Sequence, residues 1–254
     1  MNYEGNSLRH ELKYYINENV YHTLRNRLKT ILKPDPNMKS EEGYLITSIY
    51  FDDIYRSALN EKISGARFRK KFRVRAYERE DSLIKLECKS KYDEYISKDA
   101  VNLSREEYDL LMVGNYDFLF NRNEKLCKEL LVYNRINLLK PVVTVEYQRE
   151  AYILDEGNVR LTFDKDISAS TSSLNMFEED FTTTKVLPEN VMILEVKYDN
   201  YLPSKVQSIL RTAMTEKCAI SKYVMCRENK RRNKYIWLIF QIFLKRDFYK
   251  RLAI

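Results

Sequence analysis

Five short segments of the sequence share a pattern in which charged residues flank an apolar one. An alternation of two places the charged side chains on one face of a β-strand and the apolar side chains on the other. Any one such strand alone is typical of a sheet with a solvent-facing side. Because the same polar face returns in distant parts of the chain, we expect the five faces to look at one another across a shared space. The segments are Glu11–Lys13, Arg73–Arg75, Glu87–Lys89, Arg160–Asp164 and Glu195–Lys197.

Cations outnumber carboxylates on these polar faces, which restricts what the shared space can hold. Enclosed cations repel one another and are costly to remove from water. A polyanion would resolve this conflict, since arginine grips phosphate with two hydrogen bonds and lysine acts as a point charge. The carboxylates would then be hard oxygen ligands for Mg²⁺ or Mn²⁺. The cations are Lys13, Arg73, Arg75, Lys89, Lys98, Arg149, Arg160 and Lys197, and the carboxylates are Glu11, Glu87, Asp164 and Glu195.

Other catalytic chemistries have no motif in this sequence. There is no Walker loop and no GxGxxG segment, and His10 and His22 have no cysteine or serine partner in a known motif. Phosphoryl transfer needs no nucleophilic side chain, because it depends mainly on positioning and charge stabilisation. The charged faces therefore favour chemistry on phosphates.

The composition indicates a reduced protein with a sizeable core. The 254 residues are 44% hydrophobic and include 20 Tyr and 11 Phe but only 5 Gly and 5 Pro, unlike a disordered chain. The net charge of +7 points to an anionic partner. No apolar run follows the polar N-terminal residues, and the four cysteines lack paired or metal-type spacing, so we expect a cytoplasmic location.

The order of elements predicts an α+β fold. The apolar faces of the strands need cover, so helices should pack on that side and leave the charged faces to the concave side. We therefore expect a closed, mostly antiparallel eight-stranded β-barrel with a wet lumen and helices packed outside. Glu146 has opposite parity to Arg149 on one predicted strand and is left out of the lumen. The predicted strands cover residues 8–17, 44–51, 95–103, 142–154, 159–167 and 191–198, with a hairpin over 67–91 that turns at 80–82. The predicted helices cover about 19–33, 52–62, a stretch capped by Ser104 and Glu107, a stretch capped by Asn121 and Glu124, 203–214, and a stretch after Ser221, and residues 168–185 are predicted to be a loop.

Eight motifs of the sequence, taken together, resemble those of a known family. In order, HELKYYI, SIYFD, RVRAY, LECKSK, VEYQREAY, VRLTFD, ILEVKYD and SKY resemble the VTC domain, the polyphosphate polymerase module of the triphosphate tunnel metalloenzyme superfamily, from Arg9 to about Cys226. The resemblance implies that Glu195 binds the metal, preferably Mn²⁺ rather than Mg²⁺, and that Tyr147 and Ser221 line the tunnel beside the phosphates. The implied phosphate-binding residues are Lys13, Arg73, Arg75, Lys89, Lys98, Arg149, Arg160, Lys197 and Lys222, and the catalytic ones among them are Arg73, Arg75, Arg149, Arg160 and Lys197.

The resemblance implies an ATP-dependent polyphosphate polymerase, a phosphotransferase whose partners are ATP and polyphosphate or triphosphate. Arg9 stands where the wider superfamily has the first Glu of ExExK, which weakens a hydrolytic two-metal interpretation. Two alternatives stay open: an inorganic or nucleoside triphosphate hydrolase on the same fold, and a non-enzymatic polyanion-binding protein. Nucleic-acid binding is not expected, because such sites interleave aromatic residues with exposed basic ones.

The sequence further divides into a tunnel domain over residues 1–229 and a basic, apolar C-terminal tail over 230–254. The tail contains YIWLIFQIFL, and about ten apolar residues are too few to span a bilayer. A packing helix and an interfacial anchor with weak membrane-surface contact are equally consistent with it. The oligomeric state is left open.

Overall fold

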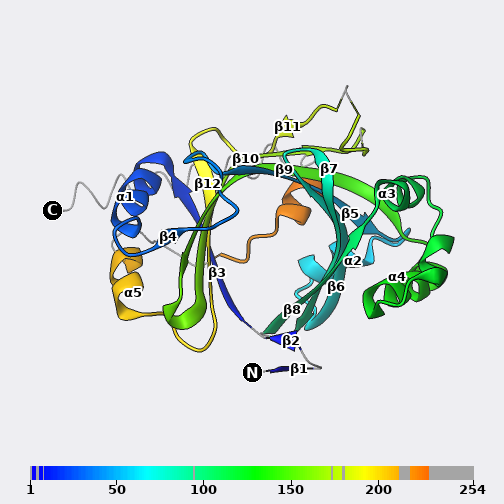
Figure 1. The fold of residues 1–254 in the computed structure, drawn as a ribbon, viewed down its shortest axis with the longest axis horizontal. Coiled ribbons are helices and arrows are strands. Elements are labelled where there is room, and N and C mark those ends of the chain that lie inside the picture. The colour runs from blue at the N-terminus through cyan, green and yellow to red at the C-terminus, as the bar shows by residue number, and fades with distance from the viewer. Residues whose placement is uncertain are drawn as a thin grey trace.

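Period-two alternation builds one strongly curved antiparallel sheet (Figure 1). In this computed structural model the described residues are 2–3, 6–7, 9–93, 95–172, 174–178, 181–211 and 218–228. Eight main strands follow the order β3-β12-β10-β9-β5-β6-β7-β8, while β4 (Lys33–Pro34) pairs with β9 and β11 (Thr184–Lys185) with β10. The main strands are β3 (His10–Asn17), β5 (Tyr44–Asp52), β6 (Phe68–Tyr77), β7 (Glu80–Tyr92), β8 (Tyr95–Leu103), β9 (Lys140–Leu154), β10 (Val159–Ser170) and β12 (Val191–Tyr198); β1 (Asn2–Tyr3) and β2 (Asn6–Ser7) pair with each other.

The expected closure of the barrel is not confirmed. No backbone ladder joins β3 to β8, the two ends of the strand order, within the described residues. Side chains reach across this seam instead: Lys89 Nζ on β7 lies 3.0 Å and 2.9 Å from the two carboxylate oxygens of Glu11 on β3. Backbone pairing demands a strand separation of about 4.8 Å, whereas two long side chains can bridge a wider gap.

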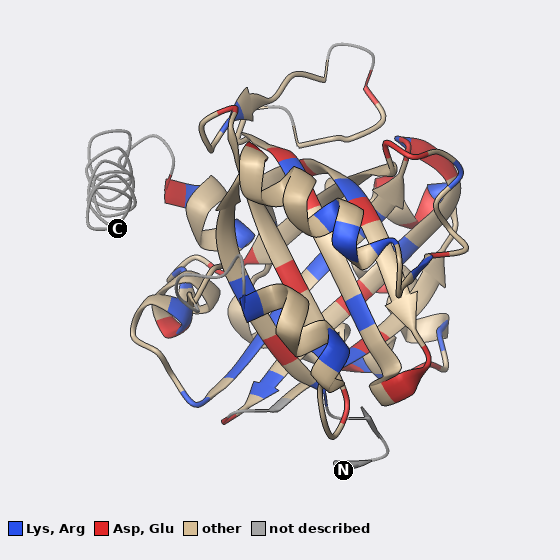
Figure 2. Cartoon of the chain, turned by 90° about the vertical axis from the view of Figure 1, so that its left-hand side faces the viewer, with Lys and Arg blue, Asp and Glu red and all other residues tan. Residues whose placement is uncertain are grey.

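The convex face of the sheet carries two of the three apolar clusters of the described residues, and helices cover it in two groups. On one side α1 (Glu18–Leu28) and α5 (Ser204–Arg211) lie over β3, β12 and β10, and on the other α3 (Arg105–Met112) and α4 (Lys125–Asn137) lie over β5, β6 and β7 (Figure 1). Basic and acidic residues follow the strands between apolar ones (Figure 2). The prediction that apolar faces point outward to helices is confirmed where these helices lie, but part of the concave face is apolar as well.

A segment near the C-terminus enters the concave side of the sheet. Residues 222–228 are helical and lie inside the curve (Figure 1). Ile220, Tyr223 and Val224 pack there against apolar residues of β9, β10 and β12. The Tyr223 hydroxyl donates a hydrogen bond to Asp52, next to the short helix α2 (Ser57–Ile63). This contact fixes Ser221 and Lys222 at the lumen wall.

Several predicted boundaries are wrong by a few residues. The first helix ends at Leu28 rather than near residue 33, because the chain then extends to pair as β4. The hairpin turns at Glu78 and Arg79, whose φ angles are 53° and 55°, so it is a two-residue turn placed before the predicted one. Much of 168–185 is irregular, as predicted, although β10 runs to Ser170.

Some of the expected helix caps form and one does not. Ser104 and Glu107 form the expected capping box at α3, and the Asn17 side chain accepts from the Val20 amide at α1. The capping box expected from Asn121 is wrong, because that residue ends a 3₁₀ turn, η1 (Asp117–Asn121), and α4 begins after Glu124 without a side-chain cap. A second 3₁₀ turn, η2, spans Glu156–Asn158.

No described helix is long and apolar enough to cross a membrane. The tail predicted over 230–254 and its membrane-surface contact lie outside the described residues.

Candidate functional site

The concave face of the sheet encloses a cavity of about 650 Å³, which lies within the range of ligand pockets. Among the described residues, fourteen Lys and Arg line it against three carboxylates, those of Glu11, Asp35 and Glu195. The cavity is therefore strongly cationic. The structure brings all predicted phosphate-binding residues, the two predicted lining residues and Glu195 to its wall: Lys13, Arg73, Arg75, Lys89, Lys98, Tyr147, Arg149, Arg160, Glu195, Lys197, Ser221 and Lys222. Glu87 and Asp164, which were predicted to be lumen carboxylates, do not line it.

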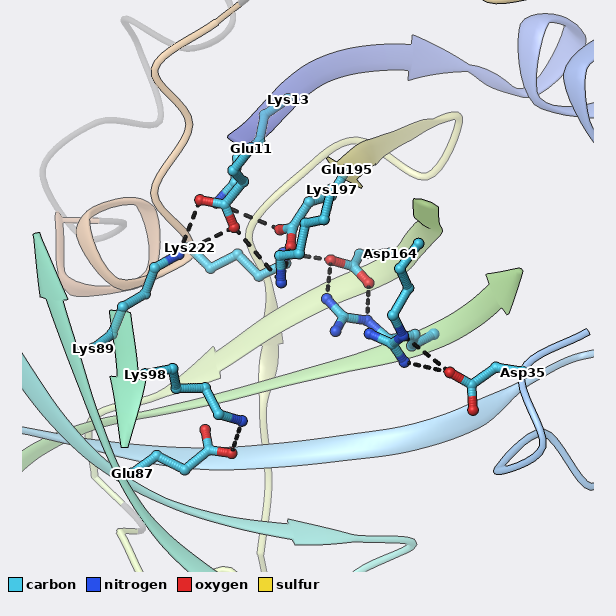
Figure 3. Close-up of polar contacts among 12 residues, drawn as sticks. Glu11, Lys13, Asp35, Glu87, Lys89, Lys98, Asp164, Glu195, Lys197 and Lys222 are labelled. Carbon is cyan, nitrogen blue, oxygen red and sulfur yellow. Dashed lines mark hydrogen bonds and ion pairs between the residues drawn. The ribbon is translucent and has the colours of Figure 1, made fainter. Parts of the chain in front are cut away.

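Glu11 and Glu195 are diagonal neighbours on the paired strands β3 and β12, each opposite a lysine, and they share these two lysines (Figure 3). Lys197 Nζ lies 2.6 Å from Glu195 and 3.7 Å from Glu11, and Lys13 Nζ lies 3.4 Å and 3.6 Å from them. Burial alone would raise the pKa of Glu195, but Lys197 and Lys13 outweigh it and hold the pKa well below its usual range. Both carboxylates therefore stay ionised and available as ligands.

These two carboxylates fit a hard divalent cation only in part. Carboxylate oxygens are the donors that Mg²⁺ and Mn²⁺ prefer. However, the described residues contain no group of three or more His, Cys, Asp or Glu arranged to hold a metal ion. A cation beside Glu11 and Glu195 would need phosphate oxygens of a substrate to complete its coordination, as is usual for Mg²⁺ with nucleotides.

A buried acid on β10 anchors the cations at the neighbouring part of the wall. Asp164 is fully buried and accepts two hydrogen bonds from Arg149, at 2.6 Å and 2.7 Å, and it forms an ion pair with Lys222. Burial alone would raise the pKa of Asp164, but Arg149 and Lys222 outweigh this effect and lower the pKa to about 2. Arg75 donates to the Tyr147 hydroxyl at 3.2 Å, and the Arg149 guanidinium lies over that ring. The arrangement holds Arg75, Arg149 and Lys222 around one aromatic ring.

Glu87 on β7 is a second buried acid that orients lumen cations. Its carboxylate contacts Arg73 at 2.6 Å and Lys98 at 2.6 Å, and Arg75 at 3.9 Å. Burial would raise the pKa of Glu87, but these cations hold it far below its usual range. Arg73 also donates to the Tyr50 hydroxyl at 2.9 Å. Like Asp164, Glu87 fixes the direction of the cations from behind the cavity surface.

Sequence reasoning missed several lining residues. Asp35 binds Arg160 at 2.9 Å, and the Tyr44 hydroxyl accepts from Arg160 at 3.0 Å. Asp35 lies between two elements and gave no signal. Tyr44 and Tyr50 lie on the same face of β5, so period-two alternation could have identified them. They were missed because nearly all residues of this strand are apolar.

A further group of lining cations has no acidic partner among the described residues: Lys62, Arg69, Lys71 and Lys91. The sequence placed Lys62 and Arg69 near a further basic position of the family without fixing the alignment, and it did not point to Lys71 or Lys91. In the described part of the chain no ion pair joins these four cations to a carboxylate, although Arg69 donates to the Ala66 carbonyl at 2.6 Å. Arg69 and Lys71 lie on the same face of β6 as Arg73, so period-two alternation could have predicted that they line the lumen. We call these four residues the unpaired cation group.

Two further residues that the sequence analysis discussed, Glu146 and Arg9, have a clear place in the structure. Glu146 points to the convex side, where Arg79 and Thr47 bind its carboxylate, so its omission from the lumen is confirmed. Arg9 lines the cavity, and its guanidinium forms an ion pair with Asp199 at 2.9 Å. The first position of the superfamily's acidic motif thus carries a cation already paired with an acid.

A curved antiparallel sheet around a basic lumen defines the triphosphate tunnel class of fold, and comparison with known proteins gives the family. Residues 8–229 match the VTC domain, and the chain belongs to that family. No match to a curated protein was found.

Among solved structures, a candidate adenylyl cyclase from Hippeastrum, described as having a dominant triphosphatase activity, is similar over 87% of this chain and 95% of its own, with a TM-score of 0.54 and 13% identity. A candidate adenylate cyclase from Bacillus halodurans is similar over 85% of this chain and 95% of its own, with a TM-score of 0.53 and 13% identity. At this identity the likeness concerns the fold.

Proposed function

We propose that this protein is an ATP-dependent polyphosphate polymerase that transfers the terminal phosphoryl group of ATP to a growing polyphosphate chain inside the basic lumen. In that reaction a terminal oxygen of the acceptor chain forms a new bond to the γ-phosphorus of ATP, the bond from this phosphorus to the β,γ-bridging oxygen breaks, and ADP leaves. Membership of the VTC domain family supports an enzyme acting on polyphosphate or triphosphate.

The excess of cations on the cavity wall is the observation that carries the proposal. Fourteen cations against three lining carboxylates are far more than one triphosphate would neutralise, which suits a donor and an acceptor bound together. Phosphoryl transfer relies on holding both partners in line and on stabilising negative charge. In this proposal Arg73, Arg75, Arg149, Arg160 and Lys197 stabilise the charge on the transferring group, since buried carboxylates keep them aimed at the lumen.

The metal is assigned to Glu195, with Glu11 beside it. Mn²⁺ or Mg²⁺ bound there would neutralise charge on the phosphate oxygens as a Lewis acid. Lys13 and Lys197 hold both carboxylates ionised, and each would then be free to turn toward phosphate. Lys89, Lys98, Tyr147, Ser221 and Lys222 would bind further phosphate oxygens from other parts of the wall.

A triphosphate hydrolase is the second candidate, and the fold shared with the Hippeastrum protein favours it. Against it stands Arg9, which adds a cation where that chemistry needs a carboxylate. A binding protein without catalysis is the third.

One assay separates the three. The protein is incubated with ATP and Mn²⁺, with a chelator-treated sample as control, and the products are resolved by size. Long polyphosphate is expected. Orthophosphate alone would establish the hydrolase, and unchanged ATP would leave only a binding role.

A further inference from the structure

The cations of the lumen fall into two groups that differ in their partners. Lys13, Arg73, Arg149 and most others contact a carboxylate, whereas the unpaired cation group contacts none in the described residues. Mutual repulsion inside a partly enclosed cavity opposes folding unless a ligand offsets it. Such a group is therefore a candidate ligand site in its own right.

Lys71 lies at the centre of this group. Its Nζ lies 3.5 Å from the Ser221 hydroxyl oxygen and 4.9 Å from the centre of the Tyr223 ring. The charged side chains that act on it are Lys62 and Glu61 from α2, Arg69 from β6, Lys89 from β7 and Lys13 from β3. Lys91 lies opposite Arg69 on β7, and Lys222, on the segment that Lys71 contacts, is paired with Asp164.

The proton on Lys71 is consequently held weakly. Burial and then the nearby cations, Lys62 first, lower the pKa of Lys71 to about 7. Glu61 is the acid that acts on it, but burial and the neighbouring Asp52 and Asp53 raise the pKa of Glu61, and no ion pair joins the two side chains. Near pH 8 the free protein therefore keeps Lys71 largely neutral.

The unpaired cations also extend a longer row. Arg69, Lys71, Arg73 and Arg75 alternate along one face of β6, and six residues of strand span about 20 Å. A row of that length suits a chain of several phosphates better than a single phosphate group. Its Arg73 and Arg75 end is the part already assigned to the reacting phosphates.

We propose that Arg69, Lys71 and Lys91 form an additional phosphate subsite for the acceptor polyphosphate chain, and that binding of the chain adds a proton from solvent to the Lys71 amine. The proposal rests on the proposed function for the name of the chain as acceptor, but the binding itself needs no turnover. A phosphate placed against Nζ favours the ammonium form, since an opposite charge at close range stabilises the charged state. The chain would thus bind more tightly at lower pH than its own charge accounts for.

The experiment measures proton uptake on binding. Short-chain polyphosphate is titrated into the full-length protein at pH 8 by calorimetry in two buffers with different ionisation enthalpies, without ATP. The buffer dependence should show uptake of up to one proton by the wild type. Lys71→Met should lose this uptake and bind the chain about tenfold more weakly at pH 6.5, the effect of one lost charged hydrogen bond.

Two variants serve as controls. Lys71→Arg keeps a charge at every pH, so it should bind the chain at pH 8 at least as tightly as wild type but without proton uptake. Lys70→Met alters the adjacent residue of β6, which points to the convex side and pairs with Glu129 at 2.5 Å, and it should bind the chain with wild-type affinity and uptake. Thermal denaturation of each variant verifies folding.

Equal enthalpies in the two buffers for the wild type would overturn the proton step. Undiminished binding by a folded Lys71→Met at pH 6.5 would overturn the subsite. If the subsite holds but ATP yields no polymer, the proposed polymerase fails and the subsite stands, so the two failures can be told apart.

Discussion

Two of the regions in which this protein buries charged side chains, the lumen and a cluster beneath α1, differ in charge balance. Beneath α1, Glu150 is fully buried and accepts hydrogen bonds from Tyr21 and Arg25, both at 2.5 Å, from Tyr152, and from Lys165 at 3.4 Å. Burial raises the pKa of Glu150, but these donors outweigh it and lower the pKa.

In that cluster every buried charge has its partner inside the protein. In the lumen the cations exceed the acids, and four of them have no acidic partner in the described part of the chain. A balanced cluster stabilises the fold, whereas an unbalanced one stabilises a bound ligand of opposite charge. The two regions should therefore respond oppositely to mutation.

The largest effect is expected in the balanced cluster. Glu150→Gln should lower the free energy of unfolding by about 3 kcal/mol, because it removes a fully buried carboxylate and leaves the half-buried Arg25 and Lys165 beside a neutral group. Urea denaturation measures this. Glu41→Gln removes an exposed partner of the same Arg25 and should change the free energy by less than about 1 kcal/mol. A small effect at both positions would mean that charge balance does not distinguish the regions.

Arg75→Ala is the matching change in the lumen. Loss of the Arg75 guanidinium should lower polymer synthesis by a factor of about 10² to 10³, as removal of a charge-stabilising donor does in other enzymes. The fold should remain, since one of several mutually repelling cations is removed, and Glu87 keeps Arg73 and Lys98. If the variant melts well below wild type without ligand, Arg75 is structural and belongs with the balanced cluster.

Glu195→Gln tests whether a lumen acid acts on lysines or on metal. As a metal ligand, its loss should cut turnover by about tenfold or more, with excess Mn²⁺ restoring it in part, and leave metal-free triphosphate binding largely intact. Initial rates across an Mn²⁺ series measure this. Were Glu195 merely the partner of Lys197 and Lys13, triphosphate would bind as well or better and turnover would survive at low Mn²⁺.

A ligand should supply the charge that the lumen lacks. At a hundred times its dissociation constant, triphosphate should stabilise the fold by about 2.7 kcal/mol, a rise in melting temperature of roughly 5–10 °C. Differential scanning fluorimetry at constant ionic strength measures the shift. Glu150→Gln should show the same shift from a lower baseline, and no shift in wild type at saturating triphosphate would remove the tunnel hypothesis.

The pH dependence of the free protein tests the unpaired cation group without a ligand. Because the pKa of Lys71 is lowered to about 7 from an ordinary 10.5, the unfolded chain binds more protons between these values, and Lys71 costs less stability as the pH rises through that window. Lys71→Met should thus melt higher than wild type at pH 6, and the difference should shrink toward pH 9.5. A difference independent of pH would mean that Lys71 is charged throughout.

Much of the site was predictable because alternation is a local property. Glu195 and Lys197 must leave one face of a strand wherever that strand lies, and the same holds for Arg73 and Arg75. The predicted site residues on strands consequently came to one cavity, and Ser221 and Lys222, which the family resemblance implied, joined them there. Asp35 could not be found in this way, because its place beside Arg160 depends on how an irregular segment packs.

The sequence by itself determined the strands, their apolar and charged faces and the family, since these depend on the order and spacing of side chains along the chain. Only the tertiary structure decided which cation meets which acid. Lys89 reaches Glu11 across a seam without backbone pairing, and Lys222 reaches Asp164 from a helix inside the sheet. Lys71 forms no ion pair with an acid in the described part of the chain. Partner choice depends on strand order, tilt and distances between residues far apart in the chain, and period-two alternation carries no information on these.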